Sequence, residues 1–213
     1  HGFASSPHGR KVERLRVLLE PEMELVTPDL NAPSFEKLDF RAIVERAFEA
    51  GSGSHIAVIV GSSLGALVAL EVSNRGINAP LVLLAPAFGI ADRWASSIPE
   101  GDPIEVYNWA LDRKAPIRRA FFLQMSRVRI DDDPPRARVA VIMGRRDESV
   151  PFDSVASTWE RWQRSGTLVP GSKFVEIAEG DHGLINLAEV IAGEIRAAAR
   201  YPENMGAVTT YPP

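Results

Sequence analysis

The serine in the stretch GSSLG lies in surroundings that could support nucleophilic catalysis. Ser63 is the centre of this G-x-S-x-G pattern, which follows the apolar run HIAVIV. In such a pattern a buried strand leads through a sharp turn into a helix, and the turn holds the serine hydroxyl beyond the end of the sheet. Only small residues fit beside it, and Gly61 and Gly65 meet that need. Ser63 is therefore the candidate nucleophile, and its neighbour Ser62 is disfavoured because it is only the first x of the pattern.

A serine hydroxyl needs a base within hydrogen-bond distance before it can attack. His182 lies in AEGDHGL, directly after a predicted strand. Because parallel strands all end at one edge of a sheet, His182 is expected at the same edge as Ser63. The other histidines lie near the beginning of the sequence or at the start of a strand: His1, His8 and His55.

The base in turn needs a carboxylate that fixes its tautomer and stabilises the imidazolium. Asp147 follows a strand in MGRRDESVP and is the favoured acid, with Glu148 and Asp153 as rivals. Asp181 adjoins His182, and adjacent side chains seldom point at each other. We therefore expect Asp181 to cap its own loop.

An oxyanion needs two backbone N–H donors. One is expected from Leu64, the residue after the nucleophile, and the other from a loop that follows an early strand. The stretch HGF fits that loop, with the N–H of Phe3 as the donor.

These residues must be positioned by regular elements, and apolar runs rich in β-branched residues predict the strands. We expect strands at 55–60, 80–87, 138–144 and 173–180, and a short one that begins near residue 22 and ends at Pro28.

Apolar residues at helical spacing predict helices between the strands. Asp39 is the expected cap of one helix, and Gly51 its stop. The expected helices cover residues 11–20, 40–50, 64–75, 152–164 and 183–200. Strands that alternate with helices predict an α/β fold in three layers, with a mostly parallel sheet and helices on both faces.

The interval 88–136 interrupts this alternation and is expected to be an insertion with helices of its own, a lid or cap on a single domain of residues 1–213. Between Arg113 and Ile130 it holds six basic residues and no acidic one. Either a helix covers the mouth of the site and its arginines are simply solvated, or the helix takes part in binding. In the second case an apolar face shapes an acyl pocket and the arginines attract an anionic part of the substrate. The candidate substrate-binding residues are Arg118, Arg119, Phe121 and Phe122.

The composition excludes several classes of function. The chain has 213 residues, 45% of them hydrophobic, and a net charge of -4, which argues against a general nucleic-acid binder. The absence of cysteine excludes disulfides, thiolate metal sites and cysteine nucleophiles. No apolar stretch approaches the roughly 20 residues of a membrane span. We predict no cofactor and no metal, and a cytoplasmic location that depends on what precedes His1.

Taken together, the stretches HGFASSP, GSSLGA, GRRDESVP and GDHGL resemble the α/β-hydrolase superfamily. More narrowly, they are similar to the small bacterial serine esterases of the YqiA type. The resemblance covers nearly the whole chain and is weakest over the insertion. It implies the α/β-hydrolase fold and a catalytic triad in the chain order Ser63, Asp147, His182.

The function predicted from the sequence is hydrolysis of carboxylic esters of small molecules through an acyl-enzyme. The same triad also serves thioesterases, acyltransferases, peptidases and lactonases, because all pass through the same kind of intermediate. A non-catalytic binding module of the same fold is the other alternative. Dehalogenases and epoxide hydrolases of this fold need an aspartate at position 63 and are disfavoured.

Overall fold

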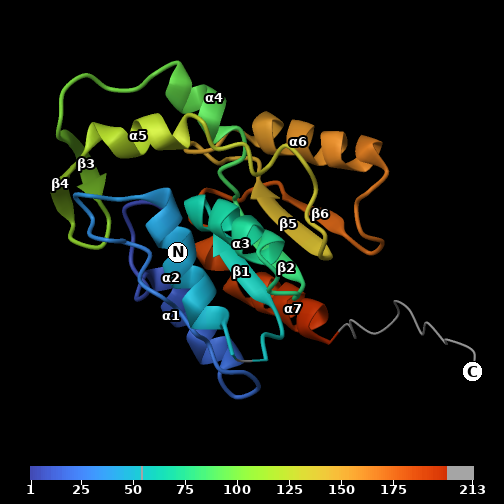
Figure 1. Cartoon of the computed structure of the whole chain (residues 1–213). Helices are drawn as coiled ribbons and strands as arrows, with labels where there is room; N and C mark the ends of the chain where they lie inside the picture. Colours follow the sequence, from blue (N-terminus) through green and yellow to red (C-terminus); the bar gives the residue numbers. More distant parts are fainter. Residues whose placement is uncertain (54, 201–213) are drawn as a thin grey trace, which may run out of the picture.

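A four-stranded parallel sheet forms the centre of the computed structural model, which describes residues 1–53 and 55–200 (Figure 1). Its strands lie in the order β1-β2-β5-β6 and all run in one direction. The strands are β1 (Ile59–Ser62), β2 (Leu81–Leu84), β5 (Val139–Gly144) and β6 (Lys173–Ile177). Strands β2, β5 and β6 fall within their predicted segments, whereas β1 begins only at Ile59 and extends two residues beyond the predicted end at residue 60.

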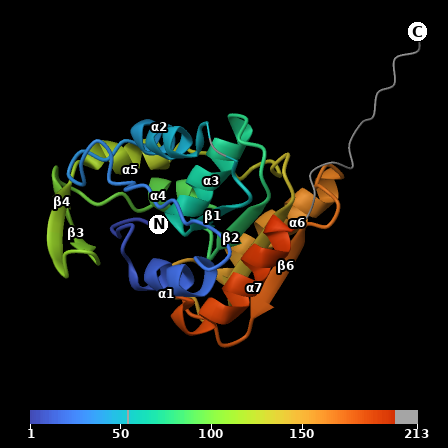
Figure 2. The same cartoon turned by 90° about the horizontal axis from the view of Figure 1, so that it is seen from below.

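Helices cover both faces of this sheet. Helices α1 (Arg10–Leu19) and α7 (Ala188–Ala199) pack together on one face, while α2 (Phe40–Gly51) and α3 (Leu64–Asn74) pack together on the other (Figure 2). Helix α6 (Phe152–Ser165) contacts β5, and a short 3-10 helix, η1 (Ile185–Leu187), precedes α7. The predicted three-layer α/β fold is confirmed. As expected, the Asp39 side chain caps α2 by accepting a hydrogen bond from the Ala42 N–H at 2.9 Å.

The predicted strand that ends at Pro28 is wrong. Within the described residues the stretch 22–30 forms no strand, because β1 is the edge of the sheet and nothing pairs with its outer side. Val60 of β1 is accordingly 38% exposed. A backbone without a strand partner must find other hydrogen bonds. The N–H of Leu30, for example, donates to Nε2 of His1 at 2.9 Å.

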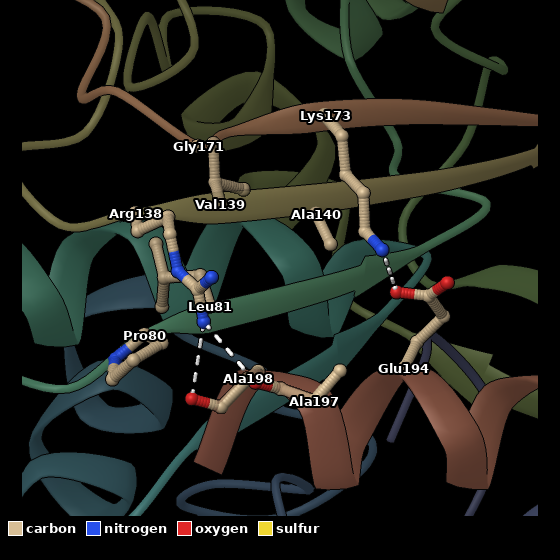
Figure 3. A pocket seen from close by; sticks show the side chains of 10 residues that line it. All are labelled: Pro80, Leu81, Arg138, Val139, Ala140, Gly171, Lys173, Glu194, Ala197 and Ala198. Carbon is tan, nitrogen blue, oxygen red and sulfur yellow. Dashed lines mark hydrogen bonds and ion pairs between the residues drawn. The ribbon is translucent and has the colours of Figure 1, made fainter. Parts of the chain in front are cut away.

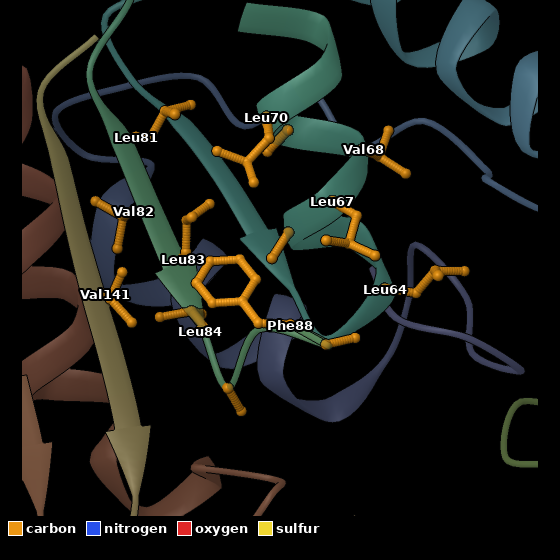
Figure 4. Packing of buried hydrophobic residues seen from close by; sticks show 14 of the residues in the cluster. Leu64, Leu67, Val68, Leu70, Leu81, Val82, Leu83, Leu84, Phe88 and Val141 are labelled. Atoms are coloured by element: carbon orange, nitrogen blue, oxygen red, sulfur yellow. The ribbon is translucent and has the colours of Figure 1, made fainter. Parts of the chain in front are cut away.

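The core extends over both faces of the sheet, and its part between the sheet and α3 fixes the position of the turn that carries Ser63. All four residues of β2 are buried, as are Leu64, Leu67 and Leu70 of α3. Figure 4 shows these side chains beside Phe88, which lies just past the end of β2. A helix that is apolar nearly all round is a buried helix. The first turn of α3 therefore cannot shift without disturbing the core.

The chain between β2 and β5, which includes the interval 88–136 and is called the insertion below, has elements of its own. It contains α4 (Ile90–Ala95), an antiparallel hairpin of β3 (Ile104–Asn108) and β4 (Arg113–Ile117), and α5 (Arg119–Met125). Helices were expected here, but the hairpin was not. The buried Asp131 ties the two ends of the insertion together, because its Oδ2 accepts a hydrogen bond from the Gly89 N–H at 2.8 Å. Residues 201–213, which the single-domain prediction includes, lie outside the described residues.

A small pocket lies at the opposite end of the sheet from Ser63, at the amino ends of β2, β5 and β6 (Figure 3). There Arg138 donates to the carbonyls of Ala197 and Ala198, and Lys173 pairs with Glu194. These contacts fasten the end of α7 to the sheet. Across residues 1–53 and 55–200, no helix is both long and apolar enough to cross a membrane.

Candidate active site

Ser63 occupies a sharp turn between β1 and α3. Its backbone angles, a φ of 55° and a ψ of -120°, lie in a region that residues with a Cβ rarely adopt. The surrounding backbone holds this conformation. The Ser63 N–H donates to the Leu84 carbonyl at 2.9 Å, and the Ser63 carbonyl accepts from the N–H groups of Ala66 and Ala87. Strained residues of this kind are frequent at functional sites.

The glycines on either side of this turn are required by close backbone contacts. A Cβ on Gly61 would lie 2.4 Å from the Gly65 carbonyl oxygen, and one on Gly65 would lie 2.5 Å from the His1 carbonyl oxygen. The G-x-S-x-G pattern therefore allows both the turn and the approach of the amino-terminal loop.

Asp147 and His182 are hydrogen-bonded, with 2.8 Å between Asp147 Oδ2 and His182 Nδ1. The other carboxylate oxygen of Asp147 accepts from the N–H groups of Ser149 and Val150, each at 2.8 Å. Burial opposes ionisation of this carboxyl, but the hydrogen bonds from His182, Val150 and Ser149 outweigh it and lower the pKa of Asp147. Asp147 is thus an anion that orients the imidazole.

Two glycines bring the loops of Asp147 and His182 together. A Cβ on Gly144 would lie 2.1 Å from the Gly180 carbonyl oxygen, and that same oxygen accepts from the Arg146 N–H at 2.9 Å. Sequence reasoning missed this contact. The available signal was a pair of glycines, one at the end of β5, three residues before Asp147, and one shortly after β6, two residues before His182.

The other carboxylates are less suited to orient the base. Asp181 Oδ1 accepts from the Leu184 N–H at 2.7 Å, which confirms that it caps its loop. Glu148 and Asp153 are exposed. Ser63 Oγ makes no hydrogen bond among the described residues, so the contact between Ser63 and His182 that catalysis requires stays a prediction.

The loop of the predicted oxyanion donor Phe3 comes close to Ser63, and the second predicted donor, Leu64, directly follows the serine in the chain. Gly2 approaches Ser63 so closely that a Cβ on it would lie 3.1 Å from Ser63 Cβ. Phe3 and Leu64 line the same small cavity, and within the described part of the chain neither of their N–H groups has a hydrogen-bond partner. An oxyanion hole requires two unused donors that converge on one oxygen, and the convergence of these two N–H groups stays a prediction.

An aromatic cluster joins the insertion to the loop that carries Phe3. The Phe3 ring lies 5.6 Å from that of Trp94 and 5.9 Å from that of Phe121, and Phe122 lies 4.9 Å from Trp94. Phe121 is 1% exposed and Phe122 5%. Both side chains are therefore buried against Phe3 and the loop that carries it.

The two candidate arginines have partners within the chain. Arg118 forms ion pairs with Glu36 at 3.9 Å and with Asp102 at 3.7 Å. Arg119 donates from Nε to the Pro99 carbonyl at 3.3 Å. An anionic substrate group would have to compete with these contacts.

Lys11 is a residue of the site that the sequence did not reveal. Its Nζ donates to Ser62 Oγ at 2.8 Å, although 51 positions separate the two residues in the chain. Burial lowers the pKa of Lys11 to about 8, against the attraction of Asp147 and Asp181. No motif pointed to this lysine.

For metals, the described residues contain no group of three or more histidine, cysteine, aspartate or glutamate side chains that could hold an ion. The geometry is instead that of acid–base and nucleophilic chemistry. An oriented imidazole and a serine on a strained turn lie at one sheet edge.

Solved structures with the same fold include several hydrolases. Est1E from Butyrivibrio proteoclasticus, solved with ferulic acid bound, matches with a TM-score of 0.71 and 16% identity over 94% of this chain and 88% of that one. Mouse alpha/beta hydrolase domain-containing protein 10 matches with a TM-score of 0.68 and 16% identity, over 92% of this chain and 86% of that one. The esterase domain of a Rhodothermus marinus protein matches with a TM-score of 0.60 and 17% identity, over 89% and 81%. At these identities the matches show that the chain has the α/β-hydrolase fold.

The comparisons by sequence give a family. No curated protein matches the chain. The family described as "Uncharacterised protein family (UPF0227)" matches residues 1–193, which is most of the chain. The match spans the turn of Ser63, the Asp147–His182 pair and the loop of Phe3, and the chain belongs to this family, UPF0227.

Proposed function

We propose that the protein is a serine hydrolase that cleaves carboxylic esters through an acyl-enzyme. The observation that carries this proposal is the 2.8 Å contact between Asp147 and His182 at the sheet edge where Ser63 occupies its strained turn. A binding module would need neither an oriented imidazole nor a serine held in this conformation.

The chemistry follows from the roles of these groups. Ser63 Oγ attacks the ester carbonyl carbon while His182 Nε2 takes the hydroxyl proton. The carbonyl oxygen becomes an oxyanion, and the N–H groups of Phe3 and Leu64 donate to it. As the tetrahedral intermediate collapses, His182 returns the proton to the departing alcohol.

Water then repeats the sequence on the acyl-enzyme. It gives a proton to His182 and attacks the acyl carbon, and His182 then returns that proton to Ser63 Oγ as the bond to the serine breaks and the carboxylic acid leaves. Throughout, Asp147 stays ionised and stabilises the imidazolium.

We also propose that the insertion covers the site as a lid. The aromatic contacts of Phe3 with Trp94 and Phe121 support this, because they join the insertion to the oxyanion loop. A second support is the hydrogen bond from the Trp109 N–H to the Ala4 carbonyl at 2.8 Å. A single domain with this lid, and a cytoplasmic location, stay predictions.

The test is a panel of nitrophenyl esters of increasing acyl length, assayed beside acyl-CoA thioesters of the same acyl groups. We expect turnover of at least one ester, faster than that of its thioester, and no turnover by Ser63→Ala. Faster hydrolysis of the thioesters would instead make the protein a thioesterase. If turnover by the native protein does not depend on Ser63, the proposal is wrong.

A further inference from the structure

A lysine that the mechanism above does not use reaches into the site. Lys11 lies in the first turn of α1 and is only partly exposed. Its ammonium group donates to Ser62 Oγ at 2.8 Å. Ser62 is the last residue of β1 and directly precedes Ser63. The lysine is thus hydrogen-bonded to the side chain of the residue that leads into the strained turn.

The same ammonium group interacts with the two other loops of the site. The charges of Asp147 and Asp181 raise the pKa of Lys11 from a distance, since among the described residues neither carboxylate forms an ion pair with it. Asp147 orients His182, and Asp181 is the residue before His182. One cation therefore acts on all three segments that carry the predicted triad, by a hydrogen bond to the first and by charge on the other two.

Such an arrangement is suited to holding loops in register. A hydrogen bond from a charged donor is about twice as strong as a neutral one. Charge attraction inside a protein is also much less screened than in water. Because a small displacement of a catalytic group lowers the rate steeply, a cation that fixes three loops at once affects the turnover number.

We propose that Lys11, in its charged form, is a positioning residue that holds the loops of Ser63, Asp147 and His182 in their catalytic arrangement. This inference rests on the proposed function. It assigns to Lys11 no contact with substrate and no proton transfer.

The protonation state of Lys11 should make the turnover number depend on pH. Burial lowers the pKa of Lys11 to about 8, so its charge is lost on the alkaline side of neutrality. When the charge is lost, the hydrogen bond to Ser62 weakens and the attraction to Asp147 and Asp181 disappears. We therefore expect the turnover number to fall as the pH rises through about 8.

The carboxylates of Asp147 and Asp181 are the charged groups that act on Lys11 from the loops at the sheet edge. On α7, which packs against α1, Arg196 pairs with Glu22 and donates to the Leu18 carbonyl at the far end of α1.

The experiment compares Lys11→Met and Lys11→Arg with a matched control, Lys37→Met, at an exposed lysine outside the site. The turnover number and KM for a nitrophenyl ester are measured from about pH 6 to about pH 10. The free energy of unfolding at neutral pH is measured for the same four proteins. Lys11→Met keeps a long side chain without the charge, whereas Lys11→Arg keeps a charge that is not lost in this range.

We expect Lys11→Met to lose up to about 100-fold in turnover number with little change in KM. It should also lack the decline near pH 8 and be at least as stable as the native protein, because it no longer buries a charge. Lys11→Arg should retain more activity than Lys11→Met, again without the decline near pH 8. Lys37→Met should match the native protein in all respects.

If ester hydrolysis depends on Ser63, the proposed function stands, and either of two results would then overturn only the inference about Lys11. One is a Lys11→Met protein with the native turnover number and the native alkaline decline. The other is a loss of activity that parallels a loss of stability with the pH profile unchanged, which is the signature of a structural role. A native protein without turnover that depends on Ser63 would overturn both the inference and the proposed function.

Discussion

Asp147 Oδ2 lies 2.8 Å from His182 Nδ1, while the other oxygen of the same carboxylate accepts two backbone N–H groups. The side chain of Asp147 is fully buried. It is therefore held on both sides, and the imidazole that it orients cannot rotate freely. Most of the expected behaviour of the site follows from this pair.

Replacing Asp147 by asparagine should keep the shape of the pair and favour the wrong tautomer of His182. The expected loss is about 10⁴-fold in turnover number. Asp153→Asn, at an exposed position after the same strand, is the matched control and should be nearly silent. A severe effect of Asp153→Asn together with a silent Asp147→Asn would show that the acid is misassigned.

The difference in stability between the native protein and Asp147→Asn is expected to depend on pH. Because the pKa of folded Asp147 lies below its ordinary value, its ionised form stabilises the fold above the unfolded pKa of about 3.9. That contribution is lost as the pH falls through the lowered pKa. The difference in unfolding free energy between the native protein and Asp147→Asn should therefore shrink below about pH 4.

Gly144→Ala should separate the loops of Asp147 and His182. The added Cβ would lie 2.1 Å from the Gly180 carbonyl oxygen, so the backbone must move. We expect unfolding to become easier by about 1–3 kcal/mol. The turnover number should fall by up to about 100-fold, because the acid and the base no longer meet correctly.

The control for this change is Gly193→Ala. Gly193 lies inside α7 with open space around its Cβ position. Alanine there should leave the activity unchanged and stabilise the helix by about 0.5–1 kcal/mol. If Gly144→Ala behaves like Gly193→Ala, the close approach of the two loops does not position the pair.

Reversing the charge of both candidate arginines, by Arg118→Glu with Arg119→Glu, tests whether they are simply solvated or attract an anionic part of the substrate. Arg118 already pairs with Glu36 and Asp102 in the structure. We therefore expect an anionic ester and a neutral ester of the same acyl group to respond equally to the double reversal and to added salt. A rise in KM confined to the anionic ester, with a matching salt dependence, would show that the arginines attract the substrate.

Much of the fold could be predicted because it rests on local patterns. Apolar runs rich in β-branched residues predicted β2, β5, β6 and the first half of β1, and helical spacing predicted α1, α2, α3, α6 and α7. The candidate triad residues could also be chosen from the sequence, since each follows a strand and parallel strands end at one edge.

The features that were missed depend on contacts between distant segments. The stretch 22–30 has the composition of a strand, but pairing at the edge of β1 decides whether one forms. Lys11 meets Ser62 only because the fold brings the first turn of α1 within reach of the end of β1. The approach of Gly144 to Gly180 likewise exists only once β5 and β6 are paired.

Labelling with a fluorophosphonate probe tests the central claim most directly, because only an activated serine reacts with it. The native protein should gain one adduct, and peptide mapping by mass spectrometry should place it on Ser63. Ser63→Ala should gain none, and His182→Ala should react much more slowly because the hydroxyl has lost its base. An unlabelled native protein, or an adduct on Ser62 that persists in Ser63→Ala, would contradict the claim that Ser63 is the nucleophile.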